Sequence, residues 1–148
     1  MSARLSRHDY FLKMAELVAR RSTCSRRSVG CVLTNEHGHV IGTGYNGVPR
    51  NMPHCIDQPC AGACAKSGTD LDACQAVHAE INALLQCGDV EAINTIYLTC
   101  SPCVQCCKAL MNTGAKLLVF SSEYKGWADG LDQLWKQAGK QALLRVPE

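Results

Sequence analysis

The spacing of apolar residues along the chain predicts four helices. Residues 8–21 have apolar residues at helical spacing and charged residues between them, which is typical of an amphipathic helix. The same reasoning predicts three further helices, over residues 76–87, 102–113 and 129–139. Gly88 and Gly114 follow two of these stretches and predict their ends, and Pro102 suits a first helical turn.

Short apolar stretches predict four strands, over residues 29–34, 39–44, 95–99 and 116–120. The Asn-Glu-His-Gly sequence at 35–38 lies between the first two and predicts a hairpin turn. The predicted order is helix, strand, strand, helix, strand, helix, strand, helix. This order favours an α/β fold in which helices cover a mixed sheet.

Residues 45–75 are rich in Gly, Pro, Asn and Cys and predict a loop. An irregular loop of this length is unusual in a small domain. The cysteines at 55, 60, 64 and 74 offer ligands through which a bound metal ion could order it.

Length and composition indicate one globular domain over residues 1–148, with 47% hydrophobic and 19% charged residues. The net charge of +2 gives no electrostatic footprint for long nucleic acid. The one basic cluster, residues 20–21 and 26–27, is either a solvated face or a site for a small anion.

The chain has no apolar run that could span a bilayer, and its charged N-terminus has no apolar signal core, so a cytoplasmic location is expected. Eleven cysteines in a reducing compartment favour metal thiolates over disulfides.

A candidate zinc centre combines residues from two predicted helix starts. Cys103 and Cys106 lie three apart at the start of one helix, and His78 lies at the start of the preceding one. If these helix starts converge across the intervening strand, they supply one imidazole and two thiolates and leave a fourth zinc position open, as in catalytic sites. Glu80 then need not be a ligand, and it can carry protons between a water molecule and a substrate.

Cys-x-x-Cys alone would equally fit a redox pair or half of a structural zinc site, and a lone His-x-Glu is uninformative. Together, His-Ala-Glu at 78–80 and Pro-Cys-Val-Gln-Cys at 102–106 form the complete pattern of zinc-dependent base deaminases. Cys107 is expected to pack in the core, and Cys100 to end a strand without a chemical role.

Five blocks of the chain resemble the deoxycytidylate (dCMP) deaminases of the cytidine deaminase superfamily. They are residues 22–30, 44–49, 54–57, 78–83 and 99–103. The resemblance extends from about residue 7 to residue 140. It implies a three-layer α-β-α sandwich with a five-stranded mixed sheet flanked by helices.

The resemblance also implies a reaction, the hydrolysis of dCMP to dUMP, the precursor of thymidylate, and ammonia. Glu80 would protonate the ring nitrogen and assist the departure of the amine. Backbone groups near Ala79 and Ser101 would hold the pyrimidine edge.

For the substrate phosphate, Arg26 is the first candidate and Arg27 the second. The resemblance implies that Tyr124 lies nearby with assistance from Lys125, although an edge-strand aromatic explains Tyr124 equally well. Asn46 fits a sugar hydroxyl, because its amide both donates and accepts, or it simply forms a tight turn.

The resemblance further implies a second, structural zinc. Its expected ligands are Cys24, Cys55, Cys60 and Cys74, and four thiolates make a closed tetrahedral site. His54 and Cys64 are alternative ligands, and unligated buried cysteines are the alternative to any site.

Relatives of this type imply a homo-hexamer that dCTP with Mg²⁺ activates and dTTP inhibits, with the effector bound near the Gly-Tyr-Asn-Gly loop at 44–47. Residues 51–53, which follow this loop, depart from the glycine-rich sequence common in those relatives. The rival hypotheses are a zinc deaminase for cytidine, guanine, a tRNA adenosine or modified dCMP, a non-catalytic nucleotide-sensing zinc protein, and a thioredoxin-like protein. A tRNA substrate would call for a broader basic surface, and a redox protein leaves His78 and Glu80 unexplained.

Overall fold

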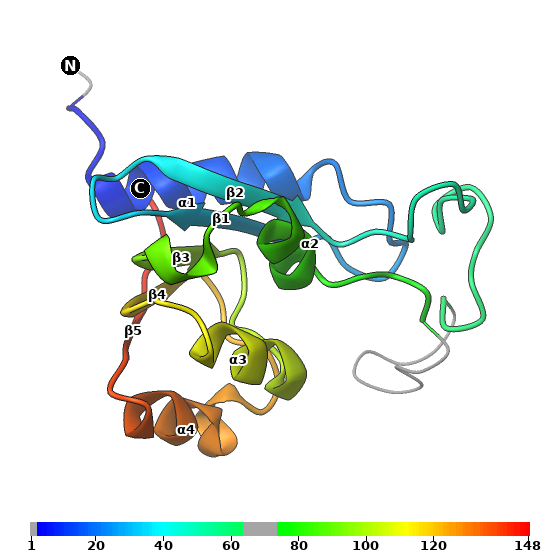
Figure 1. Ribbon diagram of the computed structural model, residues 1–148. Coiled ribbons are helices and arrows are strands. Elements are labelled where there is room, and N and C mark those ends of the chain that lie inside the picture. Colours follow the sequence, from blue (N-terminus) through cyan, green and yellow to red (C-terminus); the bar gives the residue numbers. More distant parts are fainter. Residues whose placement is uncertain (1–2, 64–73) are drawn as a thin grey trace.

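The protein, described here by a computed structural model over residues 3–63 and 74–148, is a five-stranded sheet between helices (Figure 1). The strands are β1 (Gly30–Thr34), β2 (Val40–Tyr45), β3 (Thr95–Leu98), β4 (Leu117–Phe120) and β5 (Gln141–Leu144). They lie in the order β2-β1-β3-β4-β5. β1 is antiparallel to both of its neighbours, and β3, β4 and β5 are parallel, so the predicted mixed sheet is confirmed.

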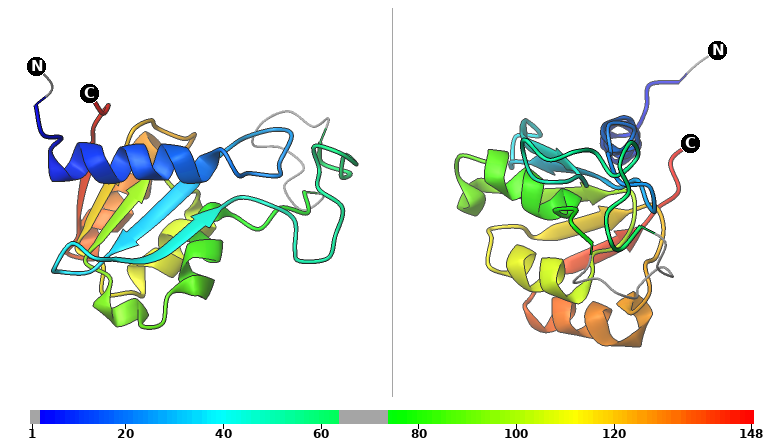
Figure 2. Two further views of the ribbon diagram at one scale, coloured as in Figure 1. Left: turned by 90° about the horizontal axis from the view of Figure 1, so that it is seen from above. Right: turned by 90° about the vertical axis from the view of Figure 1, so that its right-hand side faces the viewer.

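Helices cover both faces of this sheet. They are α1 (Arg7–Ala19), α2 (Ala79–Gln86), α3 (Val104–Met111) and α4 (Asp132–Gln137), with short turns η2 (Val90–Ala92) and η3 (Trp127–Leu131). Figure 2 shows α1 on one face and α2, α3 and α4 on the other. None of the helices in the described residues combines the length and apolar character that crossing a membrane requires.

Alternating side chains of the central strands build two apolar layers. Val32, Tyr97 and Val119 face α1 and pack against its Phe11 and Leu12. Their neighbours along the same strands face α2, α3 and α4: Cys31, Leu33, Ile96, Leu98, Leu118 and Phe120. The period-two alternation of a strand therefore divides one apolar run between two cores. Cys107 is fully buried in the second layer, which confirms its predicted packing role.

The four predicted strands are confirmed, and β5 is the one that the apolar pattern did not predict. Gln141–Leu144 is mostly exposed and pairs in parallel with β4. The predicted loop over residues 45–75 starts within β2, which ends at Tyr45, and the rest of its described part, residues 46–63 and 74–75, contains turns but no helix or strand.

The close approach of α2 to β2 depends on Gly44. A Cβ atom at Gly44 would lie 2.3 Å from the Ala79 carbonyl oxygen and 2.4 Å from the Ala83 nitrogen. Because glycine has no side chain, the first turns of α2 can rest directly on the backbone of β2.

Candidate active site

Three predicted metal ligands meet at one point. The Nδ1 atom of His78 lies 3.5 Å from the Sγ atom of Cys103 and 3.3 Å from that of Cys106. All three atoms lie within 4.8 Å of one another. Zinc bonds of about 2.0 to 2.3 Å in a tetrahedron separate ligand atoms by about 3.5 to 3.8 Å. The donor set and its spacing therefore fit a zinc ion with little rearrangement.

The two helix starts explain how these side chains converge. His78 is the N-cap of α2 and Cys103 is the N-cap of α3, and both have extended backbone conformations. Neither side chain bonds to its own helix, so both are available to a metal ion. α2 and α3 begin two to three residues later than the apolar pattern indicated, because His78 and Cys103 precede the helical turns, whereas Cys106 lies in the first turn of α3.

Contacts within the trio shift its protonation. A hydrogen bond from Cys106 lowers the pKa of Cys103 to about 4, and the same contact raises the pKa of Cys106. The sulfur of Cys103 raises the pKa of His78. The trio thus stabilises a thiolate even without a metal, and thiolate is the form that binds zinc.

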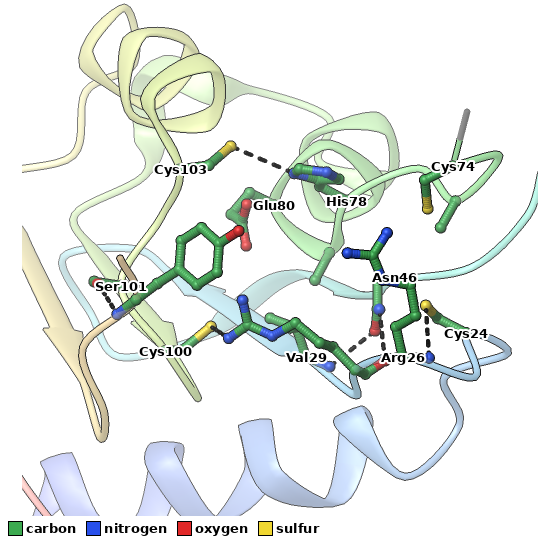
Figure 3. A pocket seen from close by; sticks show the side chains of 14 residues that line it. Cys24, Arg26, Val29, Asn46, Cys74, His78, Glu80, Cys100, Ser101 and Cys103 are labelled. Carbon is green, nitrogen blue, oxygen red and sulfur yellow. Dashed lines mark hydrogen bonds between the residues drawn. The ribbon is translucent and has the colours of Figure 1, made fainter. Parts of the chain in front are cut away.

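Glu80 lies beside the trio without belonging to it. Its side chain comes from the first turn of α2, is 4% exposed, and lines the same pocket as His78 and Cys103 (Figure 3). Burial raises the pKa of this carboxyl group, and the adjacent Cys106 thiol partly offsets the effect. A buried carboxyl group with a raised pKa is suited to accept and return protons near neutral pH.

The residues predicted to contact a substrate line this pocket together. They are Arg26, Asn46, Ala79, Ser101 and Tyr124. Lys125, which was expected to assist at the phosphate, does not line it. The pocket walls come from the segment before β1 and from the segments that follow β2, β3 and β4. All of these lie at the same end of the strands.

Two of these polar side chains already have protein partners. The Asn46 amide oxygen accepts a hydrogen bond from Val29 N at 2.8 Å, and its Nδ2 donates to Arg27 O at 2.8 Å. The guanidinium of Arg26 donates from Nη1 to Gly62 O at 3.0 Å. Asn46 therefore holds the backbone before β1, and Arg26 holds the long loop.

Arg27, the second candidate for the phosphate, also lines the pocket, and so does Cys100, for which no chemical role was expected. The guanidinium carbon of Arg27 lies 4.2 Å from the centroid of the Tyr124 ring, and its Nη2 donates to Cys100 Sγ at 3.3 Å. Burial raises the pKa of the Cys100 thiol to about 11. The signal available in the sequence was the position of Cys100 next to Ser101, within the same block.

The other cysteines gather less closely. Cys55 Sγ lies 3.7 Å from Cys60 Sγ and 3.2 Å from Ser25 Oγ, and the Ser25 contact lowers the pKa of Cys55 to about 7. Cys24 and Cys74 line the pocket wall instead. Within residues 3–63 and 74–148, only His78, Cys103 and Cys106 bring three metal-binding atoms within 4.8 Å. Cys64 lies outside the described residues.

Comparison with known proteins agrees with this geometry. A family model, "Cytidine and deoxycytidylate deaminase zinc-binding region", matches residues 5–122. A deoxycytidylate deaminase of Schizosaccharomyces pombe is 40% identical over 120 residues, which are 78% of this chain and 37% of that relative. The deoxycytidylate deaminase of Mycobacterium phage D29 is 37% identical over 121 residues, 78% of this chain and 94% of that one.

Among solved structures, the dCMP deaminase of cyanophage S-TIM5 in its apo form has a TM-score of 0.70 and 25% identity, covering 93% of this chain and 96% of that one. The chain spans little more than a third of the length of the fission yeast relative, at 37%. The family match nevertheless covers both helix starts that carry His78 and Cys103. The chain belongs to the cytidine and deoxycytidylate deaminase family.

Proposed function

We propose that this chain catalyses the zinc-dependent hydrolysis of dCMP to dUMP and ammonia. The observation that carries the proposal is the buried carboxyl group of Glu80 in a pocket that is also lined by His78 and Cys103, two of the three clustered zinc-type ligands. The 37% identity to a deoxycytidylate deaminase over 94% of that relative's length supports the substrate.

His78, Cys103 and Cys106 would hold the zinc. When bound, zinc supplies the Lewis acidity that activates a water molecule as a nucleophile. A carboxylate oxygen of Glu80 accepts a proton from that water and delivers it to N3 of the pyrimidine. The oxygen of the deprotonated water bonds to C4. Glu80 then passes the remaining proton of that oxygen to the exocyclic amino group, so that the bond between C4 and the amino nitrogen breaks, ammonia leaves and a carbonyl forms at C4.

The remaining pocket residues would orient the nucleotide. Backbone groups at Ala79 and the Ser101 region hold the pyrimidine edge. Arg26 and Tyr124 line the pocket, and they would bind the substrate phosphate. Asn46 retains one amide hydrogen for a sugar hydroxyl, since its other amide groups bind Arg27 and Val29.

The proposal includes a second zinc held by Cys24, Cys55, Cys60 and Cys74. The separation of 3.7 Å between Cys55 Sγ and Cys60 Sγ supports it, because two thiolates on one zinc lie about 3.8 Å apart. A cytoplasmic homo-hexamer of single-domain subunits, activated by dCTP with Mg²⁺ and inhibited by dTTP, completes the proposal and rests on the family resemblance alone.

The test is ammonia release from dCMP by zinc-loaded protein, for wild type and Glu80→Ala, with and without dCTP and Mg²⁺. We expect activity on dCMP that Glu80→Ala abolishes while zinc content is unchanged. Activity on deoxycytidine but not on dCMP would instead identify a nucleoside deaminase. Inactivity on both by zinc-loaded wild type would refute the proposal.

A further inference from the structure

We propose that Cys55 and Cys60 form a modification site, at which a hydroperoxide joins the two sulfurs in a disulfide and thereby loosens the wall of the pocket. The inference rests on the proposed function, because it assigns a regulatory state to that same pocket. It gives the two sulfurs an oxidised state besides their proposed ligation of the second zinc.

The two sulfurs lie close together because the chain between them turns back. The Sγ atoms of Cys55 and Cys60 are 3.7 Å apart. The backbone nitrogens of Asp57 and Gln58 both donate to His54 O, at 3.0 and 2.8 Å, and this turn brings the two cysteines together. A disulfide bond is about 2.05 Å long, so the sulfurs need to approach by only about 1.7 Å.

The surroundings of the pair give its two members different parts. Cys60 N donates to Cys55 Sγ at 3.5 Å, and Ser25 Oγ lies 3.2 Å from the same sulfur, so the Cys55 sulfur is held opposite its partner. Cys55 is 2% exposed, whereas Cys60 is half-buried and residues 56–59 are exposed. An oxidant from solvent therefore reaches Cys60 first, and Cys55 is placed to complete the disulfide.

The reaction is a two-electron oxidation, written here for hydrogen peroxide. The Cys60 sulfur attacks one peroxide oxygen, the O–O bond breaks, and Cys60 becomes a sulfenic acid while one water molecule leaves. The Cys55 sulfur then attacks the Cys60 sulfur, the S–O bond breaks, and the hydroxyl group leaves with the Cys55 thiol proton as a second water molecule. The two cysteines lose two electrons, and the peroxide gains them.

Two contacts connect this pair to the pocket. Ser25, which touches the Cys55 sulfur, directly precedes Arg26, which lines the pocket. Gly62 lies two residues after Cys60, and its carbonyl oxygen accepts a hydrogen bond from Arg26 Nη1 at 3.0 Å. A hydrogen bond weakens steeply when its geometry is distorted, so a movement of Cys60 toward Cys55 should disturb the anchor of the Arg26 side chain.

The proposed second zinc connects the pair to the pocket as well. Its other two proposed ligands, Cys24 and Cys74, line the pocket wall. Zinc binds cysteine as the thiolate, so the disulfide removes two of the four ligands. Oxidation should therefore release that ion and free the wall on both sides of Arg26.

The experiment treats zinc-loaded protein with hydrogen peroxide and maps its disulfides by mass spectrometry. Digestion with trypsin and endoproteinase Asp-N, which cuts before Asp57, separates Cys55 from Cys60, so a link between them joins two peptides. We expect this link, the release of one zinc ion per chain to a chromogenic chelator, and binding of dUMP that calorimetry finds about 2- to 10-fold weaker, as for loss of one hydrogen bond. Dithiothreitol with zinc should reverse all three changes.

Three serine variants serve as controls. Cys64 falls in the same digestion fragment as Cys60, so Cys64→Ser should keep the link and Cys60→Ser should lose it. Peroxide should leave the dUMP affinity of Cys60→Ser unchanged. Cys87 is half-buried like Cys60 but lies at the end of α2, and Cys87→Ser should respond to peroxide as wild type does.

The inference is overturned if peroxide-treated wild type has no link between Cys55 and Cys60, or if the link forms while the zinc content or the dUMP affinity stays unchanged. An equal loss of dUMP affinity in Cys60→Ser also overturns it, because oxidation of the catalytic trio would then be the cause. If Cys60→Ser does not fold, a series of peroxide doses on wild type decides, since the link and the loss of affinity must rise together.

Failure of the proposed function has a different result. Reduced wild type would then release no ammonia from dCMP, although the link between Cys55 and Cys60 would still form. Failure of the inference leaves ammonia release intact and the link absent or without effect.

Discussion

Replacement of Gly44 by alanine should displace the helix that carries His78 and Glu80. The added Cβ would lie 2.3 Å from Ala79 O, whereas ordinary contact requires about 3.4 Å. Because the obstacle is helix backbone, no side chain can rotate away, and α2 must move outward from β2 by about 1 Å.

The size of the effect follows from that displacement. Overpacking of this kind costs about 1 to 3 kcal/mol of unfolding free energy. For a chain of this length, that corresponds to a melting temperature lower by about 2 to 12 °C. A misplacement of about 1 Å in a catalytic group can reduce turnover by about 100-fold, so kcat should fall more than stability alone implies.

The assay compares Gly44→Ala with Gly88→Ala, both zinc-loaded, by thermal unfolding and by ammonia release from dCMP. Gly88 is the matched control, because a Cβ there meets nothing within 4 Å. It should behave like wild type apart from a small change in chain entropy. If Gly44→Ala unfolds at the wild-type temperature and retains activity within twofold, the close packing of α2 on β2 does not position the site, and the reasoning is wrong.

Three further outcomes are expected. Cys103→Ser should reduce zinc content at the trio by at least tenfold in a chelator competition, and full zinc retention would argue against that ligand. Glu80→Gln should keep its zinc, and its kcat should be about 100- to 10,000-fold lower than that of wild type. Steady-state kinetics that give a kcat near the wild-type value would argue against Glu80 as the proton carrier. Arg145 lowers the pKa of Asp9 to about 2 from an ordinary 3.8. This ion pair therefore stabilises the fold above about pH 4 and loses that effect as pH falls toward 2. Between these pH values, the free energy of unfolding measured with urea should fall less for Asp9→Asn than for wild type.

The apolar pattern predicted the helices and four of the strands, but it did not predict the edge strand β5. The central strands are buried on both faces and appear as uninterrupted apolar runs, which sequence patterns detect well. β5 has four mostly exposed residues and exists because β4 offers it a parallel partner. That partnership is tertiary, and no local spacing reveals it.

The metal trio was predictable because helix starts and short spacing are local features. The environment of Arg27 was not, since its partner Cys100 lies 73 residues away and their contact depends on the antiparallel pairing of β1 with β3. Two adjacent arginines look identical in a sequence. The structure separates them by what each one touches.

The location of His78 and Cys103 just before their helices has a consequence for the exchange of amide hydrogens. Neither residue lies within the helical turns it precedes, so a metal ion can leave without breaking a hydrogen bond inside α2 or α3. Bound metal, in turn, ties two helix beginnings together. The first turns of α2 and α3 should therefore lose protection against deuterium together when zinc is removed, while the sheet between them remains protected.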